Sequence, residues 1–230
     1  MEYLTMTLTT GYEITTAATN LFNAVITVIL MGGFFRMKGP SARKAVWGVS
    51  FGLFLLVCLI GTYVHGVQLS PTGKAQTWNI LYIVMAFMVA SMAVSVLYEI
   101  HGSSVLKKAV PVFAASAVVF VVLRMVISPY ISNDFILFLI YCAGILVFLI
   151  IKLLMARKEK PYLMSMVWAI LVLIAASVLQ SVNSIKFHLI WDFNYNAVYH
   201  LVTLVFLIMM YYAIKRAALM DTAENTSAAG

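Results

Sequence analysis

The stretch "WNILYIVMAFMVASMAVSVLYEI", residues 78–100, decides the fold class of this chain. Its only charged residue is Glu99, which lies next to the end of the stretch. A helix of about 20 apolar residues crosses the roughly 30 Å of hydrocarbon in a bilayer. Residues 78–100 are long enough for this, so the sequence predicts a transmembrane helix here.

Further apolar runs of similar length predict six more transmembrane helices. Of all residues, 63% are hydrophobic and 10% are charged, whereas a soluble domain is about a quarter charged. Residues 1–16 lack the basic region of a signal peptide, so we expect the first span to be retained. The sequence predicts an all-α integral membrane protein, in which residues 1–230 form one bundle of seven transmembrane helices. The predicted spans are 17–36, 46–66, 78–100, 106–128, 134–153, 162–183 and 194–214.

Most Lys and Arg residues lie on one side of the predicted bundle. Of the fifteen, Lys74 and Lys186 lie on the other side, and Arg124 lies within a span. Loops that are rich in Lys and Arg stay in the cytoplasm. We therefore expect an external N-terminus, a cytoplasmic C-terminus, and a plasma or inner membrane. Because the positive charges are spread over short loops between apolar runs, they indicate a lipid bilayer as partner and not a nucleic acid.

Polar side chains within the spans gather toward the predicted outer face of the membrane. A polar group costs free energy in hydrocarbon, so each is a candidate for function. The inner halves of the spans are nearly free of such groups, which predicts a polar pocket open to the outside and closed below by apolar side chains. We expect the first, second, third and seventh spans to form it. The candidates are Asn20, Asn23, Thr62, His65, Asn79, Arg124, Asp192, Asn196 and His200.

The stretch "WDFNYNAVYHLV", residues 191–202, carries three of these candidates at a spacing of four. Residues at i and i+4 share a helix face. The spacing predicts that Asp192, Asn196 and His200 form one stripe that points into the bundle, toward His65 and the asparagines of the first span. Simpler roles stay open: Asp192 as a helix N-cap, the asparagines as hydrogen bonds between helices, and Arg124 reaching outward to water.

Three kinds of chemistry fit the candidates. In metal-assisted hydrolysis, His65, His200 and Asp192 would hold a zinc ion, with Asp192 as ligand or general base. In a haem site, the two histidines would ligate one iron. In a transporter, receptor or assembly subunit, the pocket would bind a small molecule or lipid without chemistry. The contacts to such a ligand would come from Asn20, Asn23, Asn79, Asn196 and Arg124.

Two short stretches give the chain a resemblance to a known group. With seven predicted spans, "GTYVHG" (61–66) and "NAVYHLV" (196–202) resemble the CREST superfamily, which includes alkaline ceramidases and adiponectin-receptor-like proteins. The resemblance implies a seven-helix hydrolase of lipid amides or esters with a zinc cofactor, in which His65 and His200 are ligands. Asn196 stands where the family has a further histidine. Gly61 stands where it has a serine, which makes the neighbouring Thr62 a catalytic candidate. The family aspartate early in the third span is missing.

Overall fold

The computed structural model describes residues 7–131, 133, 135–182 and 184–227, with side chains up to Asp221. Within these residues, seven α helices form the molecule, joined by short turns and one small β-hairpin. The α helices are α1 (Tyr12–Arg36), α2 (Ser41–Gly66), α3 (Pro71–His101), α4 (Leu106–Ile127), α5 (Phe135–Ala156), α6 (Met164–Ser181) and α7 (Tyr195–Ser227). The hairpin consists of β1 (Lys186–His188) and β2 (Asp192–Asn194), and the 3-10 turns are η1 (Gly102–Val105), η2 (Ser128–Tyr130) and η3 (Pro161–Leu163).

Local sequence explains where α3 begins and ends. The Ser70 side chain accepts a hydrogen bond from the Gly73 backbone N–H, so it caps the first turn, and Pro71 follows at the first helical position. Gly102 ends the helix with a φ of 72°. Glycine adopts this left-handed conformation with little strain, because it has no Cβ. The chain then turns back into α4.

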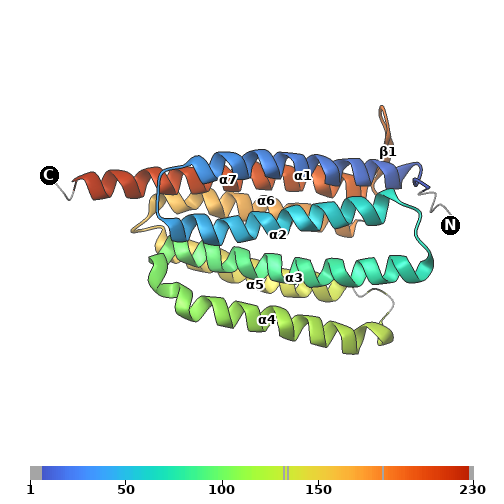
Figure 1. The fold of residues 1–230 in the computed structure, drawn as a ribbon, viewed down its shortest axis with the longest axis horizontal. Helices are drawn as coiled ribbons and strands as arrows, with labels where there is room; N and C mark the ends of the chain where they lie inside the picture. Colours follow the sequence, from blue (N-terminus) through green and yellow to red (C-terminus); the bar gives the residue numbers. More distant parts are fainter. Residues whose placement is uncertain (1–6, 132, 134, 183, 228–230) are drawn as a thin grey trace, which may run out of the picture.

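The helices run up and down in an elongated bundle, with α3 at its centre (Figure 1). Helix α3 packs against α2, α4 and α5, while α1 lies between α2 and α7, and α6 packs on α7. Helix α4 lies at the edge (Figure 1). We call the end where α1, α3, α5 and α7 begin the N-terminal end, and the other the opposite end. At the N-terminal end, Leu8 forms an antiparallel bridge with Val67.

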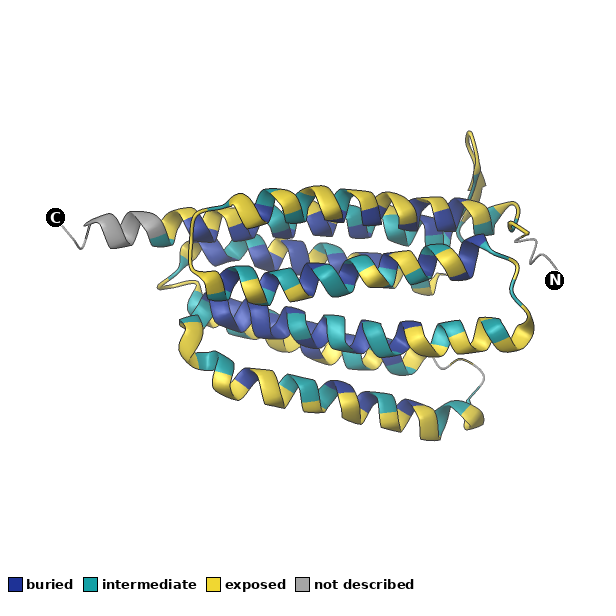
Figure 2. Cartoon of the chain, viewed as in Figure 1, coloured by how far each residue is buried: buried dark blue, intermediate teal, exposed yellow. Residues whose placement is uncertain are grey.

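Many apolar side chains remain exposed on the outward faces of the helices (Figure 2). Examples are Leu21 and Phe22 on α1, and Val118, Val119 and Val122 on α4. A soluble monomer rarely exposes apolar surface so continuously. A lipid environment accounts for this surface.

Length and composition agree with that environment. Among the described residues, six helical segments are long and apolar enough to cross a membrane, and one of them, Pro71–Tyr130, contains both α3 and α4. The all-α architecture and these segments indicate a membrane protein.

Each predicted span corresponds to one α helix, with differences at the ends. Helix α7 continues to Ser227, beyond the predicted end at 214, because good helix formers such as Ala217, Ala218 and Leu219 follow. At its other end, Asn194 belongs to β2 and not to the helix. Residue 134, which begins the fifth predicted span, and residue 183, which ends the sixth, lie outside the described residues.

Candidate functional site

A cavity of about 610 Å³ lies between the helices in the N-terminal half of the bundle. Side chains from all seven α helices line it, whereas the sequence predicted a pocket formed by four spans. Its lining, as far as the described residues show, includes neither Asp nor Glu. The described part of the lining is therefore polar without being acidic. Its amide, imidazole and guanidinium groups belong to Asn20, Asn23, His65, Asn79, Arg124, Gln180, Asn196 and His200.

Helices α1 and α7 meet at His200, five residues into α7. The Asn20 side-chain nitrogen lies 2.8 Å from Nε2 of His200 and 3.2 Å from the Thr16 carbonyl oxygen. An amide nitrogen carries two hydrogens and accepts none. We therefore assign one hydrogen to each contact, which makes Nε2 of His200 an acceptor and places the ring proton on Nδ1. His200 is a neutral imidazole in this arrangement.

The neighbouring residues of α1 fix the same contact. The Asn23 amide donates to the His200 carbonyl oxygen at 2.9 Å. Gly61 of α2 makes room for Asn20, because a Cβ at this glycine would lie 2.9 Å from the Asn20 Oδ1. The amides of Asn20 and Asn23 thus join α1 to α7, as the hydrogen-bonding alternative for these residues expects.

His65, at the end of α2, is held by the start of α1. Its Nδ1 lies 2.6 Å from a carboxylate oxygen of Glu13, and its ring packs edge-on against Trp78, with 5.5 Å between ring centroids. The Thr9 hydroxyl donates to the His65 carbonyl oxygen. His65 is buried. Sequence reasoning missed Glu13 because it lies before the predicted start of the first span.

Arg124 enters the cavity wall from α4. Its Nη1 donates to the side-chain oxygen of Asn79 at 2.9 Å, and its guanidinium lies 3.8 Å from the centre of the Tyr82 ring. The Arg124 residue is buried. The alternative in which Arg124 extends outward to water is wrong in this structure, because its guanidinium stacks on an inward-facing aromatic ring.

Asn196 and Gln180 bring α7 and α6 together at the cavity. The Gln180 amide donates to the Asn196 side-chain oxygen at 3.3 Å. Both residues line the cavity. Asn196 and His200 therefore point into the bundle, as their spacing on one helix face predicts.

Asp192 does not share that stripe, because it lies in strand β2 and not in α7. Its carboxylate bonds to Nδ1 of His188 at 2.9 Å, and both side chains are exposed. The N-cap of α7 is Asn194, whose side-chain oxygen accepts from the Ala197 backbone N–H at 2.9 Å and from the Thr16 hydroxyl at 3.1 Å. The interpretation of Asp192 as an N-cap is wrong, since the chain enters the helix two residues later than the spacing indicated.

Thr62 is also separate from the cavity lining. Its hydroxyl donates to the Cys58 carbonyl oxygen, one turn earlier in the same helix. This bond is typical of threonine within helices.

The donor atoms for zinc are not assembled in this arrangement. The Nε2 of His200 accepts from Asn20, the Nδ1 of His65 bonds to Glu13, and Asp192 lies in the hairpin. Over the described parts of the chain, no group of three or more His, Cys, Asp or Glu residues is placed to hold a metal ion. A zinc site needs three protein ligands, so a zinc ion in the cavity would require a third ligand to join His65 and His200.

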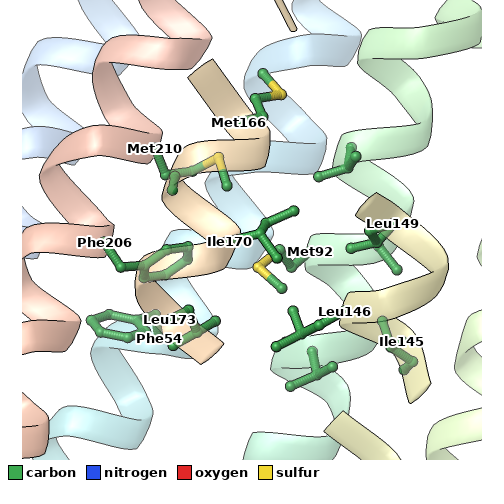
Figure 3. Close-up of a cluster of buried hydrophobic side chains, with 14 of the residues drawn as sticks. Phe54, Met92, Ile145, Leu146, Leu149, Met166, Ile170, Leu173, Phe206 and Met210 are labelled. Carbon is green, nitrogen blue, oxygen red and sulfur yellow. The ribbon is translucent and has the colours of Figure 1, made fainter. Parts of the chain in front are cut away.

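Apolar side chains close the cavity toward the opposite end. A narrow extension of about 50 Å³ shares Phe54, Met88 and Leu173 with the main cavity and reaches Trp47. Around this extension, side chains from several helices pack into a buried hydrophobic cluster (Figure 3). Those labelled are Phe54, Met92, Ile145, Leu146, Leu149, Met166, Ile170, Leu173, Phe206 and Met210.

A second buried polar cluster lies at the opposite end, where Arg43 and Glu99 form a bidentate ion pair. The Nε and Nη2 of Arg43 donate to the two Glu99 oxygens at 2.9 and 2.8 Å. The Trp47 indole donates to Glu99 at 2.9 Å, and Arg43 also bonds to Asp221 of α7. Sequence reasoning counted Arg43 among the loop cations, because only the packing of α2 on α3 buries it.

The same cluster includes the turn before α6. The Lys160 amine donates to the Glu99 and Ile100 carbonyl oxygens at 3.0 and 3.1 Å. These carbonyls lie in the last turn of α3, where helix carbonyls lack partners within the helix. The cluster thus ties α2, α3, α7 and this turn together.

Comparison with known proteins places the chain in a family. No curated protein and no solved structure matches it, and no finding links it to the CREST superfamily. A family model matches residues 15–219, a range that includes every residue lining the cavity. The chain belongs to DUF6962, a family of unknown function.

Proposed function

We propose that this protein crosses the membrane seven times, with its N-terminal end outside, and binds a lipid-like amphiphile in its cavity as a carrier or receptor. The observation that carries the proposal is the lining of the cavity. Polar side chains from separate helices converge on one space of about 610 Å³, and no carboxylate is among the described residues that line it.

The size and walls of the cavity suit a small amphiphilic ligand. Small-molecule sites usually measure about 300–1,000 Å³ and combine apolar walls with a few polar groups. The polar groups here lie on several helices, while Met85, Met88 and Phe138 supply apolar surface. A polar head would bond to the amides and His200, and an apolar chain would lie along the methionines and aromatic rings.

The charge of the lining restricts which head groups the cavity can bind. Arg124 is a permanent cation, and the described residues of the lining include no acid that would attract a second cation. The amides and the protonated Nδ1 of His200 supply donors. We therefore expect a head group that accepts hydrogen bonds and is neutral or anionic, such as a carboxylate or an ester carbonyl.

Thermal stability of the purified protein tests this proposal. Oleate and monoolein should raise the unfolding midpoint of the wild type, because a ligand that binds the folded state stabilises it, whereas oleylamine should not. The variant His200→Ala should lose the response. The matched control Thr62→Ala should keep it, since Thr62 bonds only within its own helix. A response to oleylamine equal to that for oleate would contradict the head-group argument.

A zinc-dependent hydrolase of lipid amides or esters is the second candidate, because His65 and His200 line the same cavity. It requires a third ligand to join them, which means that Asp192 would leave His188 and move into the cavity. Metal analysis of the protein purified without chelator separates the two candidates. Zinc near one equivalent would favour the hydrolase, and less than about 0.2 equivalents would exclude it, because a bound structural or catalytic zinc is held tightly. A Soret band in the same sample would indicate haem instead.

A further inference from the structure

The hairpin between α6 and α7 carries an apolar tip. Strands β1 and β2 pair antiparallel, with Phe187 opposite Phe193 and His188 opposite Asp192. The three residues of the turn are Leu189, Ile190 and Trp191, with exposed fractions of 69%, 83% and 64%. The most exposed part of the hairpin is therefore its most apolar part.

This composition is unusual for a turn. Gly, Pro, Asn, Asp and Ser dominate turns, because they adopt the required backbone angles or bond to the backbone. Here none of these residues occupies positions 189–191. Single exposed apolar residues are ordinary, but three adjacent large ones at a projecting tip would expose a continuous apolar surface to water.

The base of the hairpin is fixed to the bundle. Asn194 caps α7 and accepts from Thr16 of α1. The rings of Phe187 and Phe193 stack with centroids 5.3 Å apart and planes 9° apart. The Lys186 amine lies 5.7 Å from the centre of the Tyr12 ring. These contacts hold the strands in one direction, so the position of the tip is set by the bundle.

That direction leads away from the helices, across their axes, at the N-terminal end (Figure 1). The apolar residues of α7 begin directly after the hairpin, at Tyr195. Helices that cross a membrane lie within about 40° of its normal. A segment that leaves them sideways, where the apolar part of α7 begins, therefore extends over the surrounding lipid at the membrane–water boundary.

We propose that Leu189, Ile190 and Trp191 insert into the boundary layer of the same bilayer that the helices cross. Tryptophan favours this layer because its ring is apolar and its N–H is polar. The two helices that hold the hairpin also expose apolar residues, such as Leu21 on α1 and Leu201 on α7. Lys186, His188 and Asp192, farther back on the strands, lie at the level of the head groups. The hairpin is thus a lateral membrane anchor that holds the start of α7 at a fixed depth.

A spin label at the tip tests the anchor. Ile190→Cys is labelled in a variant without the two native cysteines, Cys58 and Cys142, which are buried, and reconstituted at low density in phosphatidylcholine vesicles. Collisions with oxygen, which concentrates in lipid, and with a water-soluble nickel complex report the environment. Thr72→Cys, exposed in the first turn of α3 at the same end of the bundle, is the control.

The inference predicts a severalfold higher ratio of oxygen to nickel collisions at position 190 than at position 72. Equal ratios would mean that the tip lies in water and would overturn it. A label at position 190 shielded from both reagents would show a protein contact and would overturn it as well. Helical circular dichroism equal to that of the wild type confirms that each variant is folded.

Discussion

Replacing Glu99 by glutamine tests whether the buried ion pair holds the opposite end of the bundle together. The Glu99 side chain is 0% exposed and accepts hydrogen bonds from Arg43 and from the Trp47 indole. Glutamine has the same shape but is neutral, and one of its two terminal atoms donates instead of accepting. The substitution therefore turns one of these bonds into a contact between two donors and leaves the Arg43 charge with less compensation.

The expected loss of unfolding free energy depends on which groups still compensate the Arg43 charge in the variant. Removing one partner of a buried ion pair costs about 3–5 kcal/mol, because the other charge stays buried. Here Asp221 still bonds to Arg43, and its side chain is 32% exposed, so solvent weakens its compensation. We expect a loss near the lower end, about 3 kcal/mol of the free energy of unfolding.

Reversible unfolding in mixed detergent micelles measures this free energy. Glu159→Gln is the control, because Glu159 is exposed at the same end and should change stability by no more than about 0.5 kcal/mol. The double variant Arg43→Met with Glu99→Leu should be more stable than Glu99→Leu alone, since it leaves no buried guanidinium unpaired. A loss of less than about 1 kcal/mol for Glu99→Gln, which is what an exposed pair contributes, would refute the reasoning.

Two further substitutions have matched controls on the same elements. Gly61→Ala should abolish the thermal response to oleate, because the new Cβ would push Asn20 away from His200. Gly52→Ala should keep the response, because a Cβ there meets nothing within 4 Å. Equal responses of the two variants would contradict the role of the contact between Asn20 and His200. Asn194→Ala should lower the free energy of unfolding by about 1–2 kcal/mol through loss of the α7 cap. Asp192→Ala should change it by no more than about 0.5 kcal/mol, because the side chains of Asp192 and its partner His188 are exposed. If the same micelle assay gave the larger loss for Asp192→Ala, Asp192 would be the cap after all.

The sequence by itself determined the helices. Runs such as 78–100 carry few polar side chains, and hydrocarbon leaves the backbone no partners but its own. Helix formation is therefore a local consequence of composition. The same cost of polar groups identified Asn20, Asn23 and His200 as inward-facing before any packing was known.

Only the tertiary structure decided which polar groups meet. Asp192 and His200 fit one stripe by spacing, but the hairpin moves Asp192 out of the helix, and spacing says nothing about where a helix starts within one turn. Arg43 and Glu99 are 56 positions apart in the chain, so no periodicity joins them. Their pairing depends on how α2 lies against α3, and the same packing of separate helices forms the cavity. Contacts between helices arise from shape and hydrogen bonding across the whole bundle, and that information is not contained in any single stretch of the chain.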